Sequence, residues 1–102
     1  SHHIDLDPSK VVGVLDCPFS LDDAGVNVKL RFMDKDDSAA AYVLGGNTAP
    51  VRVLSSTGSL SDLDLSLQGL SVTAAEDSVV RIEISGQVRE ISLKAGEQVL
   101  IK

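Results

Sequence analysis

The sequence predicts an all-β fold, a single-domain antiparallel β-sandwich of about eight or nine short strands. Three observations support this fold class. Apolar and polar residues alternate along much of the chain, turn-forming residues recur at intervals of roughly ten, and at most one helical turn can be placed. A period of two directs one row of side chains toward a core and the other toward water. The length of 102 residues suits one domain.

The N-terminal part predicts a short edge segment followed by a covered strand. Ser1-His2-His3 resembles the remnant of a purification tag, so residues 1–3 are set apart from the predicted domain, 4–102. Pro8 ends an edge segment over 4–8, because proline cannot donate to a β-ladder. Val11–Leu15 is apolar on both faces, as expected of a strand that is covered on both sides.

The next segments differ in how clearly they predict their structure. Residues 19–24 fit either one helical turn, with Ser20 as N-cap and Asp23 at the third position, or a loop. Val26–Met33 follows with the longest and most regular alternation in the chain, which predicts a strand. For residues 39–44 a strand is favoured over a short helix across the alanines.

Several further strands are expected in the C-terminal half. Val51–Leu54 predicts a brief strand before the turn sequence Ser55–Ser59. Two apolar rows follow at every second position: Leu63, Leu65 and Leu67; Val80, Ile82 and Ile84. A third alternation is less regular, with Arg89, Ile91 and Leu93 set against Val88, Glu90 and Ser92.

Turn residues separate these strands at the regular spacing typical of an Ig-like or jelly-roll-like sandwich. They are Gly69, Glu76-Asp77, Gly86 and Gly96. Strands with short turns most simply form an antiparallel meander or Greek key. The loose period also permits a β-solenoid, although no residue recurs at a fixed position.

Gly86 and the segment Leu93–Ile101 carry the one family resemblance in the chain. The phrase is similar to the strand-turn-strand near the metal centre of cupin barrels. Immunoglobulin-like bacterial modules use much the same phrase at a hairpin, where Ala95-Gly96 makes the turn. The cupin resemblance implies a small barrel that binds a ligand or metal, but the upstream histidines and glutamate of that centre are missing. The segment therefore assigns the chain to no family.

The composition argues against nucleic acid and membranes as partners. Nine basic and fifteen acidic residues give a net charge of −6, and an acidic surface repels the phosphate backbone. Anionic membranes attract Lys and Arg clusters, which this chain lacks, and no apolar stretch is long enough to span a bilayer. The only aromatic residues, Phe19, Phe32 and Tyr42, are too few for the stacking platforms of sugar-binding domains.

No catalytic, cofactor-binding or metal-binding residue is predicted, so an enzyme is not expected. Histidine occurs only at positions 2 and 3, which leaves a Ser/His/Asp or Cys/His arrangement without a base. Cys17 cannot form an intramolecular disulfide, because it is the only cysteine, and is expected to be a small buried hydrophobe. Asp62 and Asp64 alternate with leucines on a strand, which is typical of solvated charges.

Two loops have some features of ligand sites. Asp34, Asp36 and Asp37 start like a calcium loop, but Ala39 stands where an EF-hand needs glycine and Gly45 where it needs glutamate. A solvated hairpin turn is the favoured interpretation. Residues 45–48 are glycine-rich but lack the Lys-Ser/Thr pair of a phosphate loop.

Together these observations predict a non-catalytic interaction or assembly module with a protein partner or self-association, and they indicate no small-molecule ligand. Its contacts are expected in the loops 34–38, 45–49 and 55–61 or at strand edges. Residues 98–102 lack a protective proline or turn, so this segment is predicted to be paired internally or used in a homo-oligomer. The alternatives are a small cupin-like barrel that binds a ligand or metal and a calcium-stabilised adhesive domain.

Overall fold

The computed structural model describes residues 2–29, 40–43 and 50–102, which form β-strands apart from one 3-10 turn, η1 (Pro8–Lys10). The predicted all-β fold is therefore confirmed. The described residues contain more strands than the eight or nine expected: β1 (His2–Ile4), β2 (Val11–Leu15), β3 (Phe19–Asp22), β4 (Gly25–Val28), β5 (Ala40–Val43), β6 (Val51–Ser56), β7 (Leu60–Ser66), β8 (Gly69–Ala74), β9 (Ser78–Ile84), β10 (Gln87–Leu93) and β11 (Gln98–Ile101).

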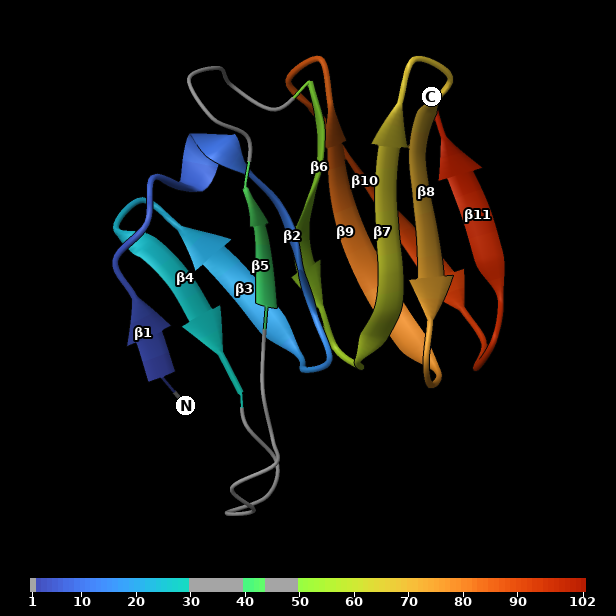
Figure 1. Ribbon diagram of the computed structural model, residues 1–102, viewed down its shortest axis with the longest axis horizontal. Coiled ribbons are helices and arrows are strands. Elements are labelled where there is room, and N and C mark those ends of the chain that lie inside the picture. The colour runs from blue at the N-terminus through green and yellow to red at the C-terminus, as the bar shows by residue number, and fades with distance from the viewer. Residues whose placement is uncertain (1, 30–39, 44–49) are drawn as a thin grey trace.

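The strands form a two-layered antiparallel sandwich (Figure 1). One layer is a six-stranded sheet in the order β1-β4-β3-β6-β9-β10. The other contains the sheet β11-β8-β7 and the pair β2-β5, and the Asp16 amide at the end of β2 donates to the Leu60 carbonyl at 2.9 Å. All strand pairs among the described residues are antiparallel, which excludes the solenoid. The end strands β1 and β10 do not pair, so the sheet does not close into a barrel.

In its C-terminal half the chain crosses repeatedly between the two layers. The hairpins β7-β8 and β9-β10 lie in different layers, while β6 pairs with β9 and β8 pairs with β11. This arrangement is not the simple meander that short turns suggested. Ala95-Gly96 likewise does not make a hairpin, because β10 and β11 belong to different sheets and the turn carries the chain across the sandwich.

The core lies between the layers and is built mainly from β-branched residues. Val11, Val12 and Val14 are at most 1% exposed, so β2 is covered on both faces as predicted. Val80 and Ile82 are buried while Arg81 is exposed, which confirms the predicted alternation on β9. The remaining core residues are Cys17, Phe19, Val26, Val28, Val51, Val53, Leu60, Leu63, Leu70, Val72, Ala74, Leu93 and Ile101.

Two sequence expectations were wrong. Residues 19–22 form strand β3, paired with β4, and only Asp23-Ala24 turn, so neither the helical turn nor the loop is present. Leu67 does not continue the apolar row of β7, because that strand ends at Ser66. Leu67 lies instead in the β7-β8 turn, 104% exposed.

Other expectations hold only in part. The strand expected over 26–33 is described to Val28 as β4, and the strand expected over 39–44 is β5. Lys29 is described and follows the end of β4. Residues 30–33 of the long alternation and the loops 34–38 and 45–49, with Asp34, Asp36 and Asp37, lie outside the described residues. At the N-terminus the edge strand is β1, which includes both histidines, while Pro8 begins η1. No described helix is long and apolar enough to cross a membrane.

Candidate interaction surfaces

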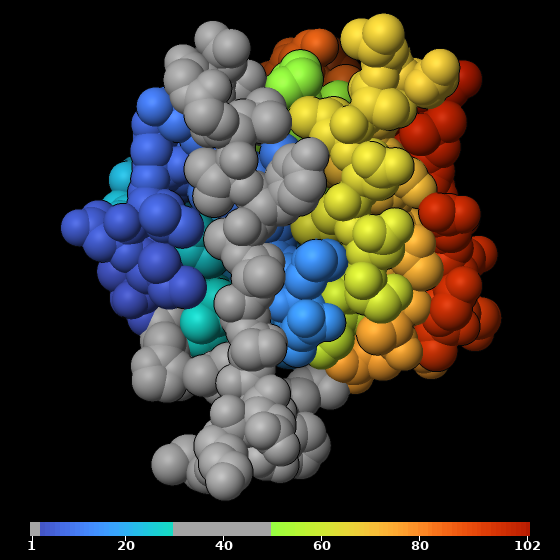
Figure 2. Space-filling model, viewed as in Figure 1, coloured from blue at the N-terminus to red at the C-terminus, as the bar shows by residue number. Residues whose placement is uncertain are grey.

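One end of the sandwich is formed by strands β10 and β11, which are consecutive in the chain and end the two sheets. In Figure 1, β10 runs behind β7 and β8 toward the right-hand end of the molecule, where β11 lies. Figure 2 shows β11 along the right margin of the same view, with no other segment over it. Among the described strands, β10 pairs only with β9 and β11 only with β8. Each therefore has one side without a strand neighbour.

The two edge strands differ in the charge of their residues. The first four residues of β10, Gln87–Glu90, are all exposed. Arg89 lies opposite Ile82, whose side chain points into the core, so the edge strand has a cation on its inward face. Charges placed in this way hinder the addition of another strand. Edge strand β10 is therefore protected.

Strand β11 has no such protection. Its residues are Gln98, Val99, Leu100 and Ile101, with neither a charge nor a proline among them. Ile101 is buried and Val99 packs against the core, while Leu100 faces outward and is 47% exposed. Gln98 Nε2 donates to Ser71 Oγ at 2.9 Å, so β11 is held to β8 by a side-chain hydrogen bond as well as by the ladder.

Of the three candidate loops, only 55–61 lies within the described residues, and it is tightly held. The Thr57 amide donates to the Val79 carbonyl at 3.1 Å, and the Val79 amide donates to Thr57 Oγ1 at 2.9 Å. The Ser59 amide donates to Glu76 Oε2 at 2.9 Å. These hydrogen bonds fix the β6-β7 turn against the start of β9, so the surface formed by this turn is preformed.

Two open pockets of about 490 and 520 Å³ meet at Thr57. The first is lined by Pro18, Phe19, Ser20, Asn27, Val28, Lys29, Ser56 and Thr57, and the second by Thr57, Asp77, Ser78, Val79, Ser92, Leu93, Lys94 and Glu97. The second pocket contains two carboxylates, and both already accept backbone hydrogen bonds. The Ala95 amide donates to Asp77, and the Lys94 amide donates to Glu97. The carboxylates therefore stabilise the crossing loop between β10 and β11.

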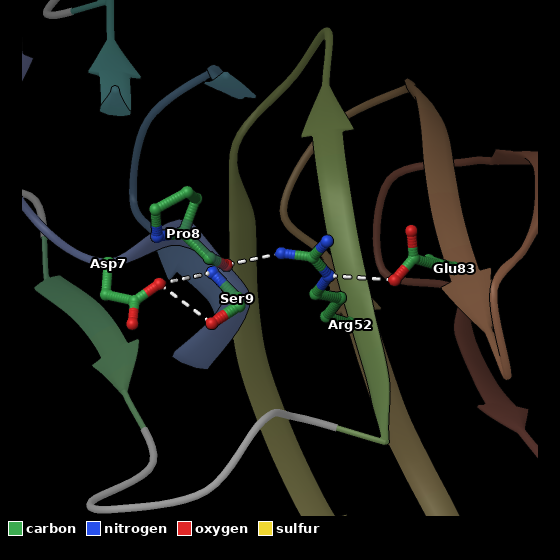
Figure 3. Close-up of polar contacts among 5 residues, drawn as sticks. All are labelled: Asp7, Pro8, Ser9, Arg52 and Glu83. Carbon is green, nitrogen blue, oxygen red and sulfur yellow. Dashed lines mark hydrogen bonds and ion pairs between the residues drawn. The ribbon is translucent and has the colours of Figure 1, made fainter. Parts of the chain in front are cut away.

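A third pocket, of about 440 Å³, surrounds Arg52 where η1 lies against β6 (Figure 3). The Arg52 Nε lies 3.1 Å from Glu83 Oε1, and Nη1 donates to the Pro8 carbonyl. Asp7 caps the 3-10 turn, because its Oδ1 accepts from the Ser9 amide at 3.1 Å and from Ser9 Oγ at 2.7 Å. These Ser9 hydrogen bonds hold the pKa of Asp7 below its usual value. This cluster was not predicted from the sequence, where its one signal is a cation between the valines of β6.

A second polar chain crosses β3, β4 and β1. Asn27 Nδ2 donates to Asp22 Oδ2 at 2.7 Å, and its Oδ1 is hydrogen-bonded to His3 Nδ1 at 2.9 Å. The bond with Asn27 lowers the pKa of Asp22 and raises the pKa of His3. All three side chains lie on the surface of the six-stranded sheet, so these hydrogen bonds link the edge strand β1 to its neighbours β4 and β3 and do not form an enclosed site.

The remaining candidate residues do not come together. Asp62 and Asp64 are exposed on β7. Cys17 is 3% exposed, as predicted, and burial raises the pKa of its thiol. Among the described residues, no three His, Cys, Asp or Glu side chains are grouped to hold a metal ion. Compared with family models, curated proteins and solved structures, the chain matches none.

Proposed function

We propose that this chain is a non-catalytic interaction or assembly module that binds its partner along the free edge of β11. The observation that carries the proposal is the contrast between the two edges at one end of the sandwich. Strand β10 carries two exposed charges, Arg89 on its inward face and Glu90 on its outer face, whereas β11 carries no charge and exposes Leu100. An edge of this second kind favours the addition of a strand.

The chemistry of the edge defines the class of partner. A sheet edge offers a row of backbone N–H and C=O groups, so its partner is an extended segment that forms the next strand of the ladder. The outward Leu100 side chain adds an apolar contact on one face of that strand. Because the backbone supplies most of the hydrogen bonds, the partner's sequence matters chiefly at alternate positions.

A peptide titration tests the proposal. A synthetic peptide that copies residues 96–102 is added to the 15N-labelled chain, and its binding is followed by the amide chemical shifts. We expect shifts concentrated on β11 and β8, with weaker binding in Leu100→Lys, which places a charge on the edge. Val88→Lys, on exposed β10, is the matched control and leaves binding unchanged. Shifts spread over the Thr57 loops, or no binding at millimolar peptide, would contradict the proposal.

A further inference from the structure

We infer that the partner of β11 is a second copy of this chain, paired antiparallel in a register centred on Leu100. The inference rests on the proposed function and names the partner. It follows from the faces of β11, from its two possible symmetric registers and from the distribution of charge near the edge.

The side chains of β11 alternate between two environments. Val99 lies opposite the buried Val72, and Ile101 opposite the buried Leu70, so both point toward the core. Leu100 lies opposite Ser71 and points outward. Residues directly opposite each other in an antiparallel pair share one face of the sheet. The cores of two copies therefore lie on the same side of the joined sheet only if the numbers of each two paired residues differ by zero or by an even number.

Two symmetric registers satisfy this condition and engage all four residues of β11. One is centred on Val99 and places Glu97 of each copy opposite Ile101 of the partner subunit. The carboxylate would then lie on the core side of the sheet beside an apolar residue, which costs free energy. This register is disfavoured.

The other register is centred on Leu100 and matches like with like. It places Leu100 against the partner's Leu100, and Val99 against the partner's Ile101. The exposed leucines cover each other on the outer face, and the apolar side chains continue the core row. Two three-stranded sheets then become one continuous sheet.

Charge on the outer face favours the same register. The row Asp62, Thr73 and Gln98 crosses the three strands β7, β8 and β11. With Leu100 at the centre, the partner's Lys102 extends this row next to Gln98. A cation is thus added to the row that begins with Asp62, and no like charges face each other across the new ladder.

Disulfide trapping tests the register. Residues opposite each other in an antiparallel pair have Cα atoms about 4.5–5.5 Å apart, within the range of a disulfide. We expect Leu100→Cys to form a covalent dimer under mild oxidation. Gln98→Cys does not, because position 98 of one subunit lies away from position 98 of the partner subunit. An equimolar mixture of Gln98→Cys and Lys102→Cys forms the mixed dimer. Cys17 is 3% exposed and is left in place.

Measurements of solution mass and a second cysteine variant, Val99→Cys, distinguish the outcomes. The wild-type chain is expected to gain mass with concentration, and Leu100→Lys to stay monomeric. Stronger trapping by Val99→Cys would overturn the register. A wild-type chain that stays monomeric up to about 1 mM would overturn the dimer. So would a dimer that Leu100→Lys leaves intact and that Leu100→Cys does not trap. The peptide titration tests strand addition separately, so the dimer can fail while the proposed function stands.

Discussion

Arg52 on β6 and Glu83 on β9 lie directly opposite each other in the six-stranded sheet, with Arg52 Nε 3.1 Å from Glu83 Oε1. The same guanidinium donates through Nη1 to the carbonyl of Pro8. One side chain therefore ties the 3-10 turn, and with it the crossing from β1 to β2, to the centre of the sheet. The Arg52 side chain is only 17% exposed, so its charge depends on these partners for solvation.

Replacing this cation tests how much the tie contributes. Arg52→Met keeps the length of the side chain but leaves the Pro8 carbonyl and the Glu83 carboxylate without their donor. We expect a loss of roughly 1–3 kcal/mol in the free energy of unfolding, measured by urea denaturation. Arg81→Met removes an exposed cation from the neighbouring strand and is expected to change stability by less than about 0.5 kcal/mol. Equal losses in the two variants would contradict this account.

The two leucines at opposite limits of burial form a second matched pair. Leu60 begins β7 and is 0% exposed, whereas Leu67 lies in the turn after the same strand. We expect Leu60→Ala to cost about 2–5 kcal/mol because it leaves a cavity in the core. Leu67→Ala is expected to change the free energy of unfolding by less than about 0.5 kcal/mol. A large loss in Leu67→Ala would show that this turn is covered in solution.

Alternation predicted the strands well wherever a strand has one buried face. Val80 and Ile82 are buried as expected, because a period of two needs only the local chain to define the faces. The prediction for residues 19–22 was wrong because the strand is short and its polar residues also fit a helix cap. Phe19 and Leu21 do alternate with Ser20 and Asp22, but this signal spans only four positions.

The candidate interaction surface could not be predicted in the same way. The sequence marked 98–102 as an unprotected segment, but which strands end the sheets depends on pairings between distant residues. That β9 lies between β6 and β10 depends on the pairing of β9 with β6, which is distant in sequence, and only then does Arg89 become an inward charge on an edge. The Arg52 cluster was missed for the same reason, since Pro8 and Glu83 are far from it in sequence.

Gly69 allows β11 to lie close to the start of β8. Its φ of 134° is in a region that other residues rarely adopt, and a Cβ there would be 2.2 Å from the Ile101 carbonyl oxygen. We expect Gly69→Ala to lower the melting temperature and to weaken trapping through Leu100, because β11 must shift. Gly86→Ala is the control. Gly86 has φ 81° with no atom within 4 Å of its Cβ position, so it should cost only about 1–2 kcal/mol. If both variants melt alike, close packing of β11 on Gly69 is not important for stability.

The hydrogen bonds of Asp22 predict a loss of stability in acid. Asn27 Nδ2 and the Ala24 amide both donate to its carboxylate, and the bond from Asn27 is the main reason that its pKa is lowered in the folded chain. A carboxyl group with a depressed folded pKa stabilises the fold above its unfolded pKa, and this contribution is lost as the pH falls through the folded pKa. We therefore expect Asp22→Asn to be less stable than the wild type at pH 7. The difference should close between about pH 5 and pH 2.

The matched control for this pH dependence is the adjacent Asp23→Asn. Asp23 is exposed and accepts no hydrogen bond from the described residues, so its replacement leaves the pH profile close to that of the wild type. Urea denaturation of the three proteins at a series of pH values measures the effect. A gap between Asp22→Asn and the wild type that stays constant down to pH 2 would mean that the carboxylate charge is not what Asn27 and Ala24 stabilise. In that case the Asp22 side chain would act through its shape in the Asp23-Ala24 turn.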